Sequence, residues 1–115
     1  MKGLIAATYT PMHNDATINL DVVPHYAEFL KGNGVKGAFI NGSTGDFVSL
    51  SVAERKSITS AWGRCKSSDL FVIDQVGHTS LKEAKELAKH AANKVDGIAA
   101  LAPYYFRLTN IDKLV

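Results

Sequence analysis

The chain contains a single cysteine, Cys65, among its 115 residues. One cysteine excludes an internal disulfide and is typical of a protein from a reducing compartment. Cys65 shares a predicted helical stripe with Ile58, Ala61 and Trp62, and no histidine or other base lies beside it in the sequence. We therefore interpret Cys65 as a buried structural thiol and not as a nucleophile.

Long apolar segments and a strong excess of one charge are also missing. No hydrophobic run approaches the roughly 20 residues of a membrane-spanning helix, and the N-terminus has no secretory signal pattern. The net charge is only +2 and the lysines are scattered, which argues against nucleic acid or a membrane surface as a partner. A cytoplasmic location is the resulting expectation. The hydrophobic content of 46% is typical of one globular domain, with no visible linker within residues 1–115.

Metal-binding and nucleophile signatures are absent as well. No G-x-S-x-G nucleophile elbow occurs, and no pair of histidines has the spacing of a metal site. Surface or capping roles are expected for all four histidines: His13, His25, His78 and His90. We therefore expect no metal and no cofactor.

Four short apolar runs recur along the chain and predict strands, at residues 4–9, 37–41, 70–76 and 97–102. Runs that are apolar on both faces are typical of a parallel sheet covered by helices. The first intervening helix is predicted over residues 21–31, with Pro24 in its opening turn. Its predicted buried residues are Val22, Val23, Tyr26, Phe29 and Leu30.

Two capping boxes predict the starts of the next two helices. In each, a serine hydroxyl and a glutamate three residues later satisfy the free N–H groups of the helix end: Ser51 with Glu54, and Ser80 with Glu83. The later helix is predicted to bury one apolar stripe, consisting of Leu81, Ala84, Leu87, Ala88, Ala91 and Ala92.

Strands therefore alternate with helices in an α/β pattern, and residues 109–115 resemble the start of a fourth helix. Two architectures fit: a compact, four-stranded doubly wound domain, or about the first half of a β/α barrel, which needs roughly 250 residues in all. The longest irregular stretches, residues 11–19 and 42–50, follow predicted strands at their carboxyl ends. Both architectures bind ligands at that edge of the sheet.

The most informative segment is the Gly-Ser-Thr-Gly-Asp of residues 42–46, directly after a predicted strand. Hydroxyl and backbone N–H groups packed this closely suit an oxyanion such as a carboxylate or a phosphate. The segment has neither the G-x-G-x-x-G of dinucleotide sites nor a Gly-Lys-Ser/Thr, and the next helix begins only at Ser51. A phosphate cradle, a site for a carboxylate or another anion, and a plain structural turn are all compatible with these residues.

Three consecutive aromatic residues end the last predicted strand: Tyr104, Tyr105 and Phe106. They cannot all point inward, so at least one faces outward. A tyrosine facing a cleft donates a hydrogen bond or relays a proton, whereas an aromatic at a subunit interface acts as a hydrophobic plug. Both interpretations stay open.

Polar residues at strand ends form a second candidate group. Asp74 and Gln75 end an otherwise apolar run and are predicted to line the rim of the sheet, with Asp15 and Asp46 near the same rim. Paired carboxylates are used in acid–base catalysis and in metal binding. Their spacing here matches no metal-ligand signature, so a metal site is not predicted.

Three motifs together carry a family resemblance: AATYTPM at residues 6–12, FINGSTGDFVSLSVAER at residues 39–55 and LAPYYF at residues 101–106. The chain resembles the N-acetylneuraminate lyase and dihydrodipicolinate synthase family of Schiff-base aldolases over essentially its whole length. Within the family, the Ser-Thr pair and the SLSVAER continuation are most similar to the N-acetylneuraminate lyases.

The resemblance implies a (β/α)8 barrel, usually assembled as a tetramer. It implies a lysine that forms a Schiff base with a 2-oxo acid, and reversible cleavage of N-acetylneuraminate to N-acetylmannosamine and pyruvate. Ser43 and Thr44 would bind the carboxylate of pyruvate or of open-chain sialic acid. Ser43 would also belong to a catalytic hydroxyl relay, and Tyr105 would match the tyrosine that a neighbouring subunit inserts into that relay.

Three positions depart from the family pattern. Asp46 stands where the family usually has glutamate, Gln75 where the lyases often have histidine, and Asp74 beside it is unexpected. The family's Schiff-base lysine and catalytic tyrosine lie on later strands, and no lysine of this chain is predicted at the carboxyl end of a strand.

We therefore expect about the first four β/α units of a barrel, with the carboxylate-binding half of the site and no activity alone. One alternative is a non-catalytic half barrel that associates with a complementary half or a full-length subunit. The other is a free-standing, flavodoxin-like binder of phosphate or nucleotide.

Overall fold

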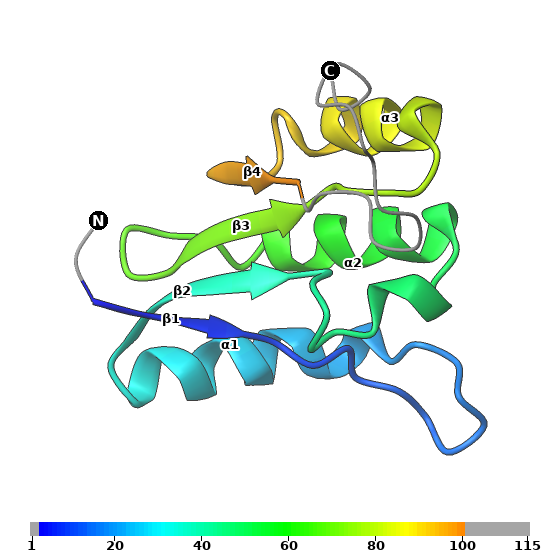
Figure 1. Cartoon of the computed structure of the whole chain (residues 1–115). Helices are drawn as coiled ribbons and strands as arrows, with labels where there is room; N and C mark the ends of the chain where they lie inside the picture. Colours follow the sequence, from blue (N-terminus) through cyan, green and yellow to red (C-terminus); the bar gives the residue numbers. More distant parts are fainter. Residues whose placement is uncertain (1–2, 101–115) are drawn as a thin grey trace.

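The computed structural model describes residues 3–100, and it shows a four-stranded parallel sheet with helices between the strands (Figure 1). Two 3-10 turns, Leu20–Val22 and Phe47–Ser49, precede the first two helices. The main elements are β1 Leu4–Ala7, α1 Val23–Gly32, β2 Val35–Ile40, α2 Val52–Gly63, β3 Phe71–Gln75, α3 Leu81–Ala91 and β4 Gly97–Ala99. The predicted alternation is confirmed, and the predicted helix start at residues 109–115 lies outside the described residues.

The strands lie in sequence order, β1-β2-β3-β4, and every neighbouring pair is parallel. Successive right-handed crossovers between adjacent strands place all the helices on one face of a sheet. Figure 1 shows α1, α2 and α3 on the same side. A doubly wound sheet has helices on both faces, so the flavodoxin-like alternative is excluded and the barrel-type arrangement is retained.

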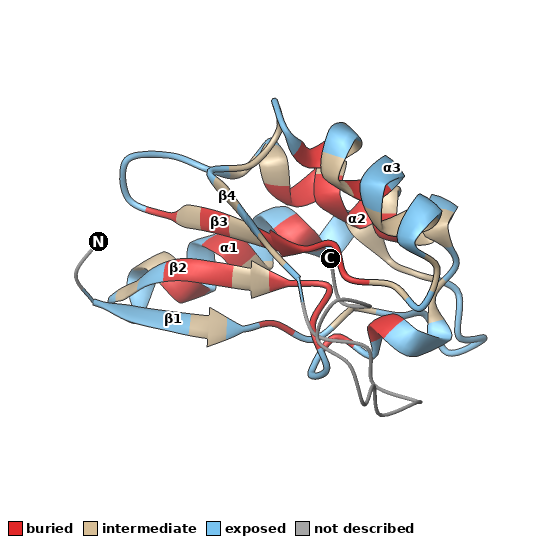
Figure 2. Cartoon of the chain, turned by 45° about the horizontal axis from the view of Figure 1, so that its top comes forward, coloured by how far each residue is buried: buried red, intermediate tan, exposed pale blue. Residues whose placement is uncertain are grey.

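The core lies between the sheet and its helices. Ala38, Ile40 and Val72 of the central strands are completely buried against α1 and α2. The α2 residue Trp62 is in the same cluster, and the ring of Tyr26 meets it edge-on with the centroids 5.3 Å apart. Figure 2 shows the two central strands largely buried and β1 largely exposed.

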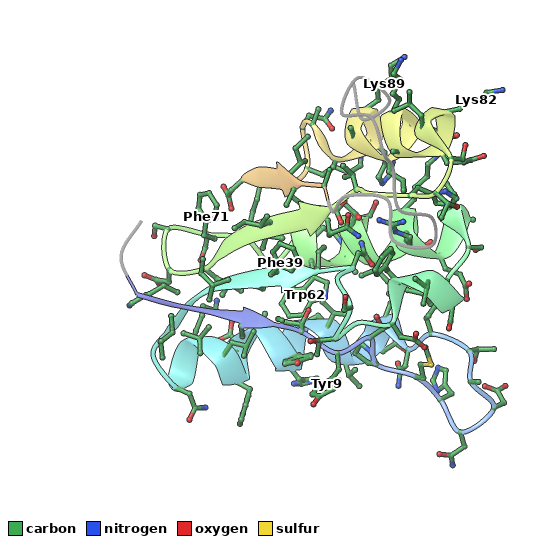
Figure 3. All side chains as sticks on the ribbon, viewed as in Figure 1. Tyr9, Phe39, Trp62, Phe71, Lys82 and Lys89 are labelled. Carbon is green, nitrogen blue, oxygen red and sulfur yellow. The ribbon has the colours of Figure 1, made fainter. Side chains whose placement is uncertain are left out.

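The other face of the sheet is apolar but is not covered by any of the described helices. Since neighbouring residues on a strand point to opposite faces, Phe39, Phe71 and Ile73 point away from the helices. Phe39 and Phe71 are labelled in Figure 3. Phe39 lies beside Ile73 in the strand register, and both are only half-buried. This uncovered face corresponds to the surface that faces inward when such a sheet closes into a barrel.

The first predicted capping box has both of its hydrogen bonds, and the second has only one of the two. Ser51 and Glu54 exchange both hydrogen bonds, at 3.1 and 2.9 Å. The Ser80 hydroxyl accepts from the Glu83 N–H at 3.3 Å, but the Ser80 N–H donates to Nδ1 of His78 at 3.0 Å. His78 therefore performs the capping role that the sequence assigned to the Glu83 carboxylate.

Some of the predicted core residues are exposed. Phe29 and Leu81 are 64% and 62% exposed. The helix α1 buries Val23, Ala27 and Leu30, a spacing that turns Phe29 to the opposite side. Leu81 lies in the first turn of α3, which buries only Leu87 and Ala91. Val22 and Ala92 are also exposed. Val22 lies just before the first residue of α1, and Ala92 lies just after the last residue of α3.

No helix in the described part of the chain is both long and apolar enough to cross a membrane.

Candidate functional site

The Ser-Thr loop leaves the carboxyl end of β2 through a residue with left-handed backbone. Asn41 follows the strand with φ 58°. The chain then curls back on itself: the N–H groups of Gly45 and Phe47 both donate to the Gly42 carbonyl, at 3.1 and 3.3 Å, and the Asp46 N–H donates to the Ser43 carbonyl at 3.0 Å. These three main-chain hydrogen bonds close the loop into a tight turn.

Ser43 and Thr44 lie at the tip of that loop, and both are exposed. Within residues 3–100, neither hydroxyl has a hydrogen-bond partner. Two hydroxyls without a partner among the described residues therefore lie on consecutive residues at the carboxyl edge of a parallel sheet, where β/α folds bind their ligands.

The loop packs against the end of β1 and against Phe39, and the absence of a Cβ at Gly42 and Gly45 allows this close approach. A Cβ on Gly42 would lie 2.7 Å from Cε1 of Phe39. A Cβ on Gly45 would lie 3.2 Å from the Thr8 carbonyl oxygen, and Thr10 Oγ1 donates to the Gly45 carbonyl at 2.6 Å. The sequence motifs at residues 6–12 and 39–55 are therefore in direct contact.

A buried polar cluster lies behind the loop, on the helix side of the sheet. The Asn41 side-chain amide donates to Asp74 Oδ1 at 2.8 Å, and the Thr59 hydroxyl donates to Asp74 Oδ2 at 2.8 Å. All three residues are at least 98% buried. Burial raises the pKa of Asp74, and the hydrogen bonds from Asn41 and Thr59 oppose that rise.

The prediction that Asp74 lines the rim is wrong. Asp74 is the register partner of Ile40, which is completely buried under the helices, so both side chains point to the helix side. Gln75 is also completely buried instead of lining the rim. Its Nε2 donates to the Asn41 carbonyl at 3.1 Å, and its Oε1 accepts from the Gly77 N–H.

Arg55 of α2 completes the support of the strand ends. Its Nη1 and Nη2 donate to the carbonyls of Gly77 and Gln75 at 2.8 and 2.6 Å, and its guanidinium carbon lies 5.2 Å from the centroid of the Phe47 ring. Sequence analysis missed Arg55, Asn41 and Thr59. The Asn-Gly at residues 41–42 is a usable signal, because that dipeptide is typical of a left-handed turn.

The other predicted carboxylates stabilise their own turns. Asp15 accepts from both the N–H and the hydroxyl of Thr17, and these hydrogen bonds lower the pKa of Asp15. Asp46, with φ 57°, accepts from the Ser49 hydroxyl at 3.1 Å. Among the described residues, no group of three or more potential metal-binding side chains occurs.

Of the remaining candidates, Tyr105 and its aromatic neighbours lie outside the described residues. Cys65 follows the end of α2 and is half-buried, and burial raises the pKa of its thiol. A thiol with a raised pKa is less often a thiolate and hence a weaker nucleophile at neutral pH, which fits the structural interpretation.

Comparison with known proteins identifies the family. The model of the dihydrodipicolinate synthetase family matches residues 1–112. The chain belongs to this family. Among curated members, it is 44% identical to the N-acetylneuraminate lyases of Rattus norvegicus and Homo sapiens. All of this chain is aligned with both proteins, but it spans only 37% of their length.

Solved structures of the dihydrodipicolinate synthetase family superpose closely on the chain. The Proteus mirabilis N-acetylneuraminate lyase matches 99% of this chain with a TM-score of 0.92 and 33% identity, over 39% of its own chain. Dihydrodipicolinate synthase from Aquifex aeolicus matches 95% with a TM-score of 0.87 and 25% identity, over 37% of its own. These enzymes are TIM barrels, and the four-stranded parallel sheet described above is a half barrel of that fold.

Proposed function

We propose that this chain carries the substrate-carboxylate site of an N-acetylneuraminate lyase, which cleaves N-acetylneuraminate to N-acetylmannosamine and pyruvate through a Schiff base. The observation that carries the proposal is the pair of exposed hydroxyls, Ser43 and Thr44, in a fixed loop at the carboxyl edge of the sheet. The 44% identity to N-acetylneuraminate lyases supports the choice of substrate within the family.

The surroundings of the loop favour a carboxylate over a phosphate. A phosphate loop leads directly into the N-terminus of a helix, whose free N–H groups bind the anion. Here the Phe47–Ser49 turn separates the loop from α2, and Ser51 and Glu54 already satisfy N–H groups at that helix end. The nearby cation Arg55 is buried and donates to main-chain carbonyls. Neutral hydroxyl donors suit a singly charged acid better than a phosphate.

In this proposal Ser43 and Thr44 donate their hydroxyl hydrogens to the carboxylate of the 2-oxo acid. Ser43 also takes part in the proton relay, to which a neighbouring subunit of a homotetramer contributes Tyr105. We further propose a cytoplasmic location, on the basis of the composition, and one partial barrel domain over residues 1–115. The tetramer and the roles of Ser43, Thr44 and Tyr105 are predictions that follow from membership in the family.

The covalent step needs a lysine from elsewhere. Lys36 is the one lysine inside a strand among residues 3–100, and it occupies the second position of β2, at the edge opposite the Ser-Thr loop. Lys36 is exposed, whereas a lysine that forms a Schiff base is typically held in a partly desolvated pocket. We therefore propose that the 115-residue chain binds the carboxylate but does not form the Schiff base by itself.

Titration of the isotope-labelled chain with pyruvate, followed by NMR, tests the carboxylate site. We expect saturable shifts of the amide signals of residues 42–45 and their loss in the double variant Ser43→Ala, Thr44→Val. Ser68→Ala is the matched control, because Ser68 is exposed and precedes β3 at the opposite edge of the sheet. Equal shifts in the double variant and the wild type would reject the site.

Borohydride reduction in the presence of pyruvate tests the covalent step. We expect the intact mass of the chain to stay unchanged, whereas a full-length N-acetylneuraminate lyase in the same reaction gains the mass of the reduced adduct. A stable adduct at any lysine of this chain would refute its predicted inactivity.

The uncovered sheet face favours a second candidate function, association of this half barrel with further β/α units. Phe39 and Ile73 present an apolar surface with no described helix over it, and β1 and β4 form the two edges of the sheet. Sedimentation of the chain alone and mixed with a full-length relative tests this. A complex, or a homodimer of the chain, supports the proposal, and a monomer in both samples contradicts it.

A further inference from the structure

We propose that Asp74 is a positioning residue for the Ser-Thr loop and acts through the side chain of Asn41. The link to carboxylate binding rests on the proposed function of Ser43 and Thr44. The link to loop geometry rests on the hydrogen bonds of the buried cluster alone.

Asp74 is an unusual residue for its position. Its neighbours on the helix side of the sheet are the apolar residues Ile40 and Val72, and Asp74 itself is 1% exposed. Within the described residues, no cation forms a salt bridge with it. Burying a carboxyl group without a salt bridge is unfavourable even when it is hydrogen-bonded, and an apolar residue at the end of an apolar strand would avoid that cost. The presence of a carboxyl group at this position therefore points to a function of the two hydrogen bonds that it accepts.

Those two hydrogen bonds join three separate elements. Asp74 ends β3, Asn41 follows β2 and Thr59 belongs to α2. Asn41 has two amide hydrogens, and they reach Asp74 Oδ1 at 2.8 Å and Thr59 Oγ1 at 3.2 Å. Thr59 gives its one hydrogen to Asp74 Oδ2 at 2.8 Å, or alternatively to the Arg55 carbonyl at 2.9 Å. In the first arrangement, each hydrogen has its own acceptor and each carboxylate oxygen has a donor.

Asn41 is the residue at which the chain changes direction. Its left-handed backbone, with φ 58°, is a conformation that non-glycine residues seldom adopt. Its side chain is held by Asp74, and its carbonyl oxygen accepts from Nε2 of the adjacent Gln75. Both anchors come from consecutive residues at the end of β3, so the dihedral angles at Asn41 are fixed by the neighbouring strand.

The conformation at Asn41 sets the path of the next residues. Gly42 lies against the ring of Phe39 and accepts from two N–H groups of the loop. Ser43 and Thr44 follow within three residues of Asn41, and no hydrogen bond of their own side chains holds them among the described residues. Their placement is therefore transmitted from Asp74 through Asn41.

Three variants separate a positioning role from a general role in the core. Asp74→Ala removes both acceptors. Asp74→Asn keeps an acceptor for Asn41 and offers an N–H to Thr59, which then donates to the Arg55 carbonyl. Val72→Ala is the matched control, because Val72 lies on the same strand and face, is completely buried and belongs to the apolar core.

The first readout is amide hydrogen exchange of residues 42–45, measured in the full chain without ligand. We expect faster exchange in Asp74→Ala, near wild-type exchange in Asp74→Asn, and unchanged exchange at these residues in Val72→Ala despite its lower melting temperature. Equal exchange at the loop in Asp74→Ala and Val72→Ala would overturn the proposal. If Asp74→Ala does not fold, Thr59→Val, which removes one donor, replaces it with the same expected ordering.

The second readout is pyruvate affinity. Loss of one buried hydrogen bond that fixes the loop is expected to weaken binding about tenfold in Asp74→Ala, with recovery in Asp74→Asn. If the wild type does not bind pyruvate, the proposed function fails, and the exchange measurement still decides the positioning role. If pyruvate binds equally to all variants, the positioning role fails and the proposed function stands.

Discussion

Nη2 of Arg55 donates to the main-chain carbonyl of Gln75 at 2.6 Å, so a side chain of α2 binds the backbone at the end of β3. Nη1 of the same guanidinium donates to the Gly77 carbonyl at 2.8 Å. One rigid, planar group thus binds two main-chain carbonyls of buried residues at the end of β3. This geometry requires arginine, because two separate nitrogens reach the two carbonyls and a lysine side chain has only one nitrogen.

Arg55→Lys is therefore expected to lower the free energy of unfolding by about 2 kcal/mol, since at least one buried carbonyl loses a charged donor. Urea unfolding followed by circular dichroism measures this. The exposed Arg64 provides the control, and Arg64→Lys should leave the midpoint almost unchanged. Equal midpoints for both variants would show that the two carbonyls do not depend on Arg55.

The buried carboxyl of Asp74 predicts a specific pH dependence of stability. Burial raises its folded-state pKa above the ordinary value of 3.8, although the hydrogen bonds from Asn41 and Thr59 and the charges of Arg55 and His90 oppose the rise. The folded state then binds the proton more tightly than the unfolded state. The contribution of this group to stability is thus greatest below the unfolded pKa and decreases as the pH rises through the folded pKa.

Asp74→Asn removes that dependence. We expect the unfolding free energy of the variant, relative to wild type, to increase as the pH is raised from about 4 and to level off above the folded pKa. Urea unfolding at a series of pH values tests this, with the exposed Asp69→Asn as control. Parallel pH profiles for wild type and Asp74→Asn would contradict the prediction.

The contact between Gly42 and Phe39 predicts a coupled pair of substitutions. Gly42→Ala places a Cβ 2.7 Å from the Phe39 ring and is expected to destabilise the fold by about 1–3 kcal/mol. In a Phe39→Ala background the same substitution has room and should cost much less. A double-mutant cycle of unfolding free energies measures this coupling, and additive effects would show that the ring moves aside freely.

The unequal capping of α2 and α3 predicts unequal effects of two matched glutamate substitutions. Glu54 accepts from the Ser51 N–H, whereas the Ser80 N–H donates to His78 instead of Glu83. Glu54→Ala should therefore lower the unfolding free energy by about 1 kcal/mol, and Glu83→Ala by distinctly less. Both residues occupy the third helical position, so the helix-dipole effect is the same in the two variants. Equal losses would mean that the reciprocal hydrogen bond adds nothing.

The sequence predicted the elements of this fold well, because its local signals agree with the tertiary structure. Apolar runs marked every strand, and Ser51 and Ser80 marked the starts of two helices. The Ser-Thr loop was located for the same reason: it directly follows a strand, and the turn residues lie within the segment itself. Features that depend only on neighbouring residues in the sequence can be predicted without knowledge of distant contacts.

The position of Asp74 was not predictable in the same way. A polar residue at the end of an apolar strand fits either face of the sheet, and the choice depends on the pairing of Asp74 with Ile40. Its two donors, Asn41 and Thr59, lie 33 and 15 residues away in the sequence. Phe29 and Leu81 were misplaced for a related reason, because the burial of a helix face depends on what the fold packs against it.

The sequential strand order also bears on how the protein is made. Every strand pairs with the strand that precedes or follows it in the chain, as in Ala7 with Phe39, Phe39 with Ile73, and Ile73 with Gly97. A nascent chain emerging from the ribosome can therefore complete each strand pair before the next is synthesised. With this order, the segment between two paired strands is only one β/α unit long. The entropy lost in closing that segment is therefore limited at each step of co-translational folding.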